Sequence, residues 1–330
     1  MQLTHKRDEL TETVLERIKK MKKQGRGKGA LCVADILRHF TVFGYINSGH
    51  FGDIYGMGIG KDPYYTKSTV TQATKTRRVP KFVMKIMYDS KLNYEEVKTL
   101  RHVNKELTSR TPHIPQYYTH FRCDNTMFRG RAKHGVAKSY EDWDFVKKGK
   151  AIILLMEYVG KTMDTFVNVN KNPYLELTLL FQLIYTTHVM QEHNILHGDI
   201  YMPNITYMPS GEDENSIWEY KVGSASYMVK VGSIVPMLID FGQSTPGKTT
   251  TKNWSTSDAY MLLRTWSHNT HHEVVRSFIE NIQTQIFVGD SEILKKRYTK
   301  TSNIIHDFFP MFKKSRSSGG SKSKPAAVWK

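Results

Sequence analysis

The sequence has few cysteines, fewer acidic than basic residues, and no long apolar run. Two cysteines among 330 residues, Cys32 and Cys123, argue against a disulfide framework. No charged segment followed by an apolar one stands near Met1, as a secretory signal would require. No apolar stretch approaches the roughly 20 residues needed to cross a bilayer. We therefore expect an intracellular protein in a reducing compartment, without a membrane span.

The shortage of acidic residues leaves a large positive charge. Against 48 Lys and Arg stand 31 Asp and Glu, which gives a formal net charge of +17. A charge of this size attracts polyanions over a Debye length. The basic residues cluster at 17–28, 75–81, 295–300 and from residue 313 onward. Solvated surface is the simplest explanation of each cluster, and binding of nucleic acid or another polyanion is the alternative.

The apolar pattern divides the chain into a sheet-rich first half and a mostly helical second half. Leu10, Val14, Ile18 and Met21 recur at helical spacing and predict a helix that ends near Gly25. The following patterns predict a hairpin over residues 40–59, strands over 82–87, 114–121 and 151–158, and a helix over 94–105. Helices are predicted over residues 175–193, 257–266 and 273–287, and for most other segments of the second half.

Four regions follow from these patterns. Residues 1–39 form a basic helical extension, residues 40–158 a sheet-rich part, and residues 159–312 a helical part. Residues 313–324 contain only Lys, Arg, Ser and Gly, which cannot bury apolar surface. Residues 313–330 are therefore expected to be a disordered basic tail.

A glycine-containing turn joins the two strands of the first hairpin. Gly49 and Gly52 lie in the run N-S-G-H-F-G-D-I over residues 47–54. Without a Cβ atom, glycine lets backbone N–H groups approach phosphate oxygens closely. Turn geometry alone explains most glycines in hairpins, so this signal is weak by itself.

A lysine interrupts the apolar strand that follows. Lys85 stands in the run F-V-M-K-I over residues 82–86, where an unpaired ammonium would carry a large desolvation cost. Glu96 on the next predicted helix can supply the anionic partner, and Glu95 is the nearby alternative. The competing interpretation is a lysine that extends to solvent from an edge strand.

Two short motifs in the second half supply carboxylates and an amide. Residues 197–204 read H-G-D-I-Y-M-P-N, and residues 238–242 read L-I-D-F-G. Phosphoryl transfer needs a carboxylate near the attacking hydroxyl, oxygen ligands for magnesium and a cation for the phosphates. Asp199, Asn204, Asp240 and Lys85 are residues of these types. The joint order of the glycine turn, Lys85, Glu96, H-x-D-x-x-x-x-N and D-F-G is hard to obtain by chance.

With these motifs the sequence resembles the protein kinase-like superfamily over residues 40–287. The resemblance implies an α+β, bilobal protein kinase-like fold, with a small β-rich N-lobe and hinge over residues 40–158. A larger helical C-lobe would span residues 159–312. It also implies a phosphotransferase that uses ATP and Mg²⁺, with Mn²⁺ as an alternative metal. The expected acceptor is the hydroxyl of Ser or Thr on a protein substrate.

The resemblance assigns roles to residues of this sequence. Lys85 would hold the phosphates, Glu96 would orient Lys85, and Asp199 would be the catalytic aspartate. Asn204 and Asp240 would be the magnesium ligands. The implied contacts with the nucleotide are the loop residues Ile46, Asn47, Gly49, Phe51, Gly52 and Ile54, and the hinge residues Met156, Glu157 and Tyr158. Asp258 resembles the aspartate that opens the central helix of the larger lobe.

Several positions depart from the family pattern. Asn47 replaces the first glycine of the phosphate loop. Gly198 replaces the arginine of H-R-D, which removes the usual partner of a phosphorylated activation loop. Tyr201 stands where Ser/Thr kinases carry a lysine, so we expect weaker compensation of transition-state charge. Asp258 follows Asp240 by only 18 residues, without A-P-E, so the peptide-docking segment is much shortened.

These departures leave the substrate class open. The H-G-D triplet is familiar from vaccinia-related and viral kinases, and from small-molecule kinases of the aminoglycoside and choline type. The short interval resembles the RIO-type atypical kinases and the same small-molecule enzymes. The basic charge, the Lys/Ser tail and these departures together resemble a kinase of a large DNA virus. Such a kinase would act in the host cytoplasm or virion. The alternatives are a small-molecule kinase, and a pseudokinase or nucleic-acid-binding scaffold.

Two further patterns are weaker. Residues 242–249 match G-x-x-x-x-G-K-[ST], a phosphate loop that requires a helix to begin at Lys248. The sequence T-T-K-N-W-S that follows is a poor helix start, and Asp290 ends the only weak candidate for the companion acidic strand. The histidines at 268, 271 and 272 lack a Cys or acidic ligand at metal spacing, so surface positions are expected for them.

Overall fold

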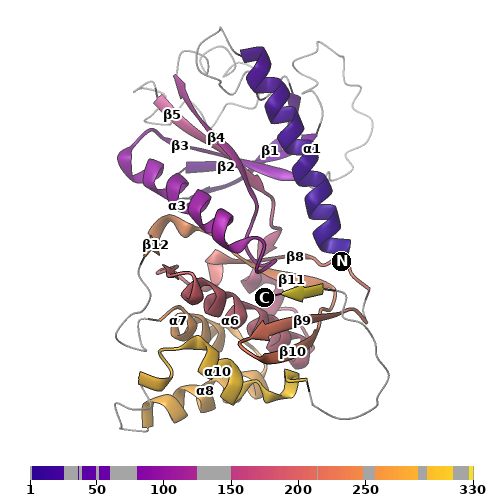
Figure 1. Cartoon of the computed structure of the whole chain (residues 1–330), viewed down its shortest axis with the longest axis vertical. Helices are drawn as coiled ribbons and strands as arrows, with labels where there is room; N and C mark the ends of the chain where they lie inside the picture. Colours follow the sequence, from indigo (N-terminus) through magenta and orange to yellow (C-terminus); the bar gives the residue numbers. More distant parts are fainter. Residues whose placement is uncertain are drawn as a thin grey trace. The chain divides into compact units, whose positions relative to one another are not determined.

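The structure is a computed structural model of the whole chain (Figure 1). It describes residues 2–25, 36, 39–49, 52–59, 80–124, 150–213, 215–247, 257–288, 296–314 and 327–329. Within them the protein is mixed α and β, compatible with the expected α+β class. The chain forms two compact units. We call Lys6–Lys98 with Gln116–Tyr158 the sheet unit, and Met1–His5, Thr99–Pro115 and Val159–Lys330 the helical unit.

The sheet unit contains a five-stranded antiparallel sheet in the order β1-β2-β3-β5-β4. Its strands are β1 (Phe40–Gly49), β2 (Gly52–Ile59), β3 (Phe82–Tyr88), β4 (Tyr117–Asp124) and β5 (Lys150–Glu157), and helix α3 (Lys91–Leu107) follows β3. The predicted hairpin, strands and helix are confirmed, although β4 begins three residues later than expected. β3 is the middle strand, and its residues 82–87 are all buried, which explains its continuous apolar run.

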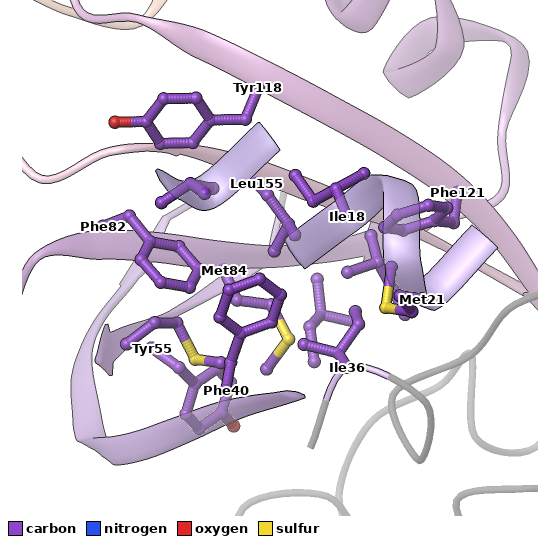
Figure 2. Packing of buried hydrophobic residues seen from close by; sticks show 14 of the residues in the cluster. Ile18, Met21, Ile36, Phe40, Tyr55, Phe82, Met84, Tyr118, Phe121 and Leu155 are labelled. Atoms are coloured by element: carbon purple, nitrogen blue, oxygen red, sulfur yellow. The ribbon is translucent and has the colours of Figure 1, made fainter. Parts of the chain in front are cut away.

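Helix α1 (Gln2–Gly25) completes the core of the sheet unit. The predicted helical face is confirmed, because Val14, Ile18 and Met21 are at most 3% exposed and pack against residues of the sheet. Figure 2 shows Ile18 and Met21 among sheet side chains such as Phe121 and Leu155. Burial of each large apolar side chain contributes roughly 1.5–3 kcal/mol. The extension expected over residues 1–39 therefore supplies part of this core.

The helical unit is built around α6 (Pro173–Glu192). Asn172 caps the helix by accepting hydrogen bonds from the N–H groups of Tyr174 and Leu175, and residues 178–190 are buried all round. The other helices are α5 (Met163–Val167), α7 (Asp258–Asn269), α8 (Glu273–Val288) and α10 (Thr301–Phe308). Among the described residues, no helix is long and apolar enough to cross a membrane.

The helical unit also contains many strands, so the prediction of a mostly helical second half is wrong for residues 205–238. This segment folds as β8 (Ile205–Pro209), β9 (Ile217–Val222), β10 (Ala225–Lys230) and β11 (Ile234–Leu238). In β9 the buried residues Trp218, Tyr220 and Val222 alternate with more exposed ones. This two-residue period is the signature of a strand, and it is visible in the sequence. The short strands β6 (Lys161–Thr162), β7 (Ile195–Leu196) and β12 (Thr245–Pro246) complete the pairs.

Part of the expected disordered tail has a defined place. β13 (Ala327–Trp329) pairs in parallel with β9, and the two strands lie side by side in Figure 1. The N–H group of Lys314 donates to the carbonyl of Ser226 at 2.8 Å, just after the short helix η7 (Pro310–Phe312). These positions differ from the disorder expected over residues 313–330, while residues 315–326 lie outside the described residues.

The packing of α1 can be tested by truncating one buried side chain. Ile18→Ala should lower the free energy of unfolding by about 2–5 kcal/mol, because the neighbouring side chains can fill the cavity only in part. Lys19→Ala, on the exposed face of the same helix, should change it by less than about 0.5 kcal/mol. Urea denaturation followed by fluorescence measures both. Equal effects of the two substitutions would contradict the packing of α1 on the sheet.

Candidate functional site

Lys85 and Glu96 form a buried ion pair in the sheet unit. The Nζ atom of Lys85 donates to Oε1 of Glu96 at 2.6 Å, and the two side chains are 11% and 7% exposed. Lys85 stands on β3, between Ile54 of β2 and Leu154 of β5, so it does not extend from an edge strand. Glu95 instead pairs with Lys98 on the exposed surface of α3. The structure thus selects Glu96 as the partner of Lys85.

Stability alone does not explain this ion pair. When two charges are buried, the free energy of their attraction seldom exceeds the free energy of hydration that they lose. A buried ion pair therefore adds little to the stability of the fold. In addition, Oε2 of Glu96 is buried and has no hydrogen-bond partner among the described residues. A pair held for structure alone would normally have both carboxylate oxygens satisfied. This arrangement keeps a lysine ammonium at a fixed position inside the sheet unit.

The glycine turn closes the first hairpin as expected. Gly49 pairs with Gly52, and Asn47 pairs with Ile54, with an irregularity in the register before Asn47. The side chain of Ile46 is 42% exposed, while that of Ile54 is partly buried. Phe51, expected at the tip of the turn, lies outside the described residues. The described backbone thus brings the two glycines opposite each other.

The end of β5 is held by a carboxylate with three hydrogen bonds. Glu157 is 3% exposed, and its two oxygens accept from Nε and a terminal nitrogen of Arg7 at 2.8 and 2.6 Å. Oε2 also accepts from the N–H of Gln116 at 2.9 Å. The N–H of Glu157 donates to the carbonyl of Gln116, so this group is not available to an adenine. Of the expected hinge residues, Met156 is partly buried beside Glu157 in the same strand, and Tyr158 follows the strand.

In the helical unit, Asp258 fixes the loop that carries Asp199. Asp258 is the first residue of α7, where a carboxylate is favoured by the helix dipole, and Ser257 caps the helix. Its two oxygens accept from the N–H groups of His197 and Gly198 at 2.7 and 3.0 Å. Burial raises the pKa of the Asp258 carboxyl, and the nearby His197 and these hydrogen bonds oppose that rise. One carboxylate therefore sets the orientation of two successive peptide groups.

His197 extends this network toward Asp240. Its Nε2 donates to the carbonyl of Ile239 at 3.0 Å, and its Nδ1 accepts from the N–H of Asp199 at 3.3 Å. Burial lowers the pKa of His197, while Asp258 acts in the opposite direction, and the two contacts together fit the neutral ring with its proton on Nε2. His197 thereby connects the backbone of Asp199 with that of Ile239, the residue before Asp240.

Gly198 has a backbone conformation that favours glycine. Its φ of 77° lies in the left-handed region, and an added Cβ would come within 3.3 Å of the carbonyl oxygen of Gln243. An arginine at this position would therefore be strained. The replacement of H-R-D by H-G-D is thus a structural property of this loop.

Asn204 and Asp199 are in direct contact. The Nδ2 atom of Asn204 donates to the main-chain carbonyl of Asp199 at 3.0 Å and to its Oδ2 at 3.1 Å. Both partners are acceptors, so the amide must present its nitrogen to Asp199. Its oxygen then faces away and accepts no hydrogen bond from the described residues. The structure thus brings together these two predicted site residues.

Asp240 has the left-handed backbone conformation that a non-glycine residue adopts only rarely. Its φ is 64° and its ψ is 72°, and Oδ1 accepts from the N–H of Gly242 at 3.3 Å, at the start of helix η5 (Phe241–Gln243). The preceding residue, Ile239, donates its N–H to the carbonyl of Asn204 at 2.9 Å. The backbones of the two expected metal ligands are therefore held next to each other.

Tyr201 lies beside the carboxylates but is open to solvent. Its side chain is 43% exposed, and the pKa of its hydroxyl is raised by partial burial and by the charges of Asp199 and Asp240. It supplies no cation at this position. Within the described residues no group of three or more His, Cys, Asp or Glu side chains is arranged to hold a metal ion. A metal here would need amide, water or ligand oxygens as well.

Two supporting residues were missed by the sequence analysis. His113 is fully buried, with its ring nitrogens at 2.9 Å from the carbonyl of Pro236 and 3.1 Å from the hydroxyl of Tyr220, and its own carbonyl accepts from Leu238. It holds the strand that leads to Asp240, and nothing in the sequence distinguishes it from a surface histidine. Arg7 could have been found, because it precedes Leu10 by three residues on the apolar face of α1.

The competing phosphate loop is not formed over the described part of residues 242–249. The N–H groups of Ser244 and Gly247 donate to the carbonyls of Phe241 and Asn194, and Thr245 and Pro246 pair with β7. A phosphate cradle needs such N–H groups to converge on the ligand. Lys248 lies outside the described residues.

No family model matches this chain, and no match is found among curated proteins. The function therefore has to be inferred from the chemistry of the side chains described above.

The role of Asp258 predicts a loss of stability on a nearly isosteric substitution. Asp258→Asn leaves one oxygen to accept from two N–H groups, so it should lower the free energy of unfolding by about 1.5–3 kcal/mol. Asp213→Asn, at an exposed position of the same unit, should have little effect. Thermal or urea denaturation measures the difference. A variant as stable as wild type would show that the carboxylate does not hold the loop.

Proposed function

We propose that this chain is an ATP- and magnesium-dependent phosphotransferase with a bilobal protein kinase-like fold. Its acceptor would be a hydroxyl group, and the acceptor that we propose is Ser or Thr of a protein. The observation that carries the proposal is the contact between Asp199 and Asn204, in which the Asn204 amide uses its nitrogen and not its oxygen. The main-chain carbonyl of Asn204 also accepts from Ile239, the residue before Asp240. Carboxylate and amide oxygens in this order are what phosphoryl transfer requires.

The donor set fits magnesium. Mg²⁺ prefers hard oxygen ligands and is usually bound by one or two carboxylates, with water and phosphate oxygens completing the shell. The carboxylate of Asp240 and the Oδ1 atom of Asn204 are ligands of this kind. When bound, the metal would neutralise charge on the transferred phosphoryl group. The left-handed backbone of Asp240 supports this assignment, since strained residues gather at functional sites.

Asp199 would orient the acceptor hydroxyl and receive its proton. One of its oxygens, Oδ2, is fixed by Asn204, and its N–H is fixed by His197. A carboxylate held in this way keeps its geometry without reorganisation when a substrate binds. In the sheet unit, the ammonium of Lys85 would bind phosphate oxygens, with Glu96 holding it in place.

The geometry also bears on regulation. A phosphorylated activation loop acts through charge-assisted hydrogen bonds to a basic residue next to the catalytic aspartate. Gly198 occupies that place here, with a backbone conformation that disfavours arginine. We therefore propose that the enzyme is active without phosphorylation between Asp240 and Asp258.

The proposal is tested by following the label of γ-labelled ATP. The purified chain is incubated with Mg²⁺ and, separately, with basic proteins, acidic proteins and small alcohols, including an aminoglycoside and choline. Label on Ser or Thr of a protein supports the proposed acceptor, and label on a small alcohol supports the small-molecule alternative. Binding of ATP without transfer to any acceptor would identify a pseudokinase. No binding of ATP at all would contradict the proposal.

Asp240→Asn should abolish magnesium-dependent binding of ATP, because a neutral amide cannot balance a divalent cation beside a triphosphate. Titration calorimetry with and without Mg²⁺ measures the loss, which should be at least about tenfold in affinity. Asp213→Asn provides the matched control and should bind ATP as wild type does. Full retention of magnesium-dependent binding by Asp240→Asn would remove Asp240 from the site.

Asp199→Ala should spare ATP binding and lower turnover by about 10²–10⁴-fold, the usual contribution of a positioned general base. The two quantities are measured by calorimetry and by phosphoryl transfer under saturating ATP. An equal loss of nucleotide affinity in Asp199→Ala and Asp240→Asn would show that the two carboxylates do not have separate roles.

A further inference from the structure

A small cavity lies in the helical unit, and none of the residues assigned above lines it. It has a volume of about 260 Å³ and is lined by residues from the C-terminal end of α6, by Arg110 after α3, and by Lys221 and Gly223 at the turn between β9 and β10. All of these elements belong to the helical unit. The volume is below the roughly 300–1,000 Å³ of pockets that enclose drug-sized ligands, so it suits a smaller molecule.

Two residues that line the cavity carry buried polar atoms without partners. The hydroxyl of Tyr185 and the Nδ1 atom of His188 have no hydrogen-bond partner among the described residues, although the side chains are 0% and 7% exposed. Buried polar atoms are nearly always paired with protein, water or ligand. Burial raises the pKa of the Tyr185 hydroxyl, so it stays protonated and is available as a donor at neutral pH.

The cavity also has an excess of positive charge. Arg110 and Lys221 line it, and neither forms an ion pair in the described part of the chain. The Nε atom of Arg110 donates to the carbonyl of Glu106, which leaves the terminal nitrogens of the guanidinium for another acceptor. Glu192 is the one acidic residue in the lining, and it is exposed.

The end of helix α6 does not offset this charge strongly. Its last carbonyls are a source of negative potential, which would repel an anion. Those of Val189, Met190 and Gln191, however, already accept from the N–H groups of His193 and Asn194. Burial lowers the pKa of both His188 and His193, so their rings are neutral at pH 7 and can donate from one nitrogen.

We propose that this cavity binds a phosphate monoester dianion, with Arg110 and Lys221 balancing its two charges and the hydroxyl of Tyr185 donating a hydrogen bond. His188 contributes a further donor from Nδ1. Four donor-bearing side chains that line one small cavity suit the three equivalent oxygens of a phosphate better than the two of a carboxylate. This inference is independent of the nucleotide site and stands or falls separately from it.

Binding is tested with O-phosphoserine as the probe, followed by ³¹P NMR at constant ionic strength. The wild-type chain should bind it, and inorganic phosphate should show the same dependence on the cavity residues. The double variant Arg110→Gln, Lys221→Met should bind at least about tenfold more weakly. Lys230→Met removes a charge from an exposed position of the same hairpin and should bind as wild type does. Serine without phosphate should not bind.

Three results would overturn the proposal. The first two are no binding of either probe at about 10 mM, and equal affinity of the double variant and wild type. The third is loss of binding in Asp240→Asn, which would place the phosphate at the other site.

Tyr185→Phe gives a second readout. Removal of an unpartnered buried hydroxyl should raise the melting temperature without phosphate and reduce the further rise that O-phosphoserine causes. A lower melting temperature without phosphate would show that the hydroxyl is already satisfied in the free protein.

Discussion

The loop geometry of the helical unit depends on the buried carboxylate of Asp258, which accepts hydrogen bonds from two backbone N–H groups. The hydrogen bonds of Asp258 orient the peptide groups of His197 and Gly198, and this orientation places the His197 ring against the carbonyl of Ile239. The loop and the strand end that carry Asp199 and Asp240 are thereby fixed by the same few contacts. Because the amide of Asn204 is oriented by Asp199, the position of its oxygen also follows from the Asp258 carboxylate. The proposed site in this unit thus depends on main-chain geometry as much as on side chains.

The sheet unit is organised by two buried ion pairs that differ in their surroundings. The Glu157 carboxylate accepts three hydrogen bonds and joins α1 to the end of β5. Glu96, by contrast, keeps one oxygen without a partner among the described residues while it holds Lys85. A fully satisfied pair can fix a structure, whereas an incompletely satisfied one contributes less to stability. The contrast supports a structural role for Arg7 and agrees with the phosphate-binding role proposed for Lys85.

The sequence predicted the features that leave a periodic apolar pattern or place an unusual residue type within one. Lys85 stood out because a cation in an apolar strand needs a partner, and α1 stood out because Val14 and Ile18 share one face. The strands of residues 205–238 were missed although β9 alternates with a period of two. The contacts of His113 could not have been found, because they join residues more than 100 positions apart. The same holds for the orientation of the Asn204 amide, which depends on the fold of the loop and not on composition.

The short strand near the C-terminus has a practical consequence for handling the protein. β13 occupies one side of β9, so β9 has a neighbour on each side in its sheet. A shortened chain that ends before Ala327, prepared to remove the basic tail, would leave the N–H and C=O groups of β9 open on that side. An unprotected strand edge pairs readily with other chains. Trimming the tail to improve crystals would therefore favour self-association, and an affinity tag is better attached at the N-terminus.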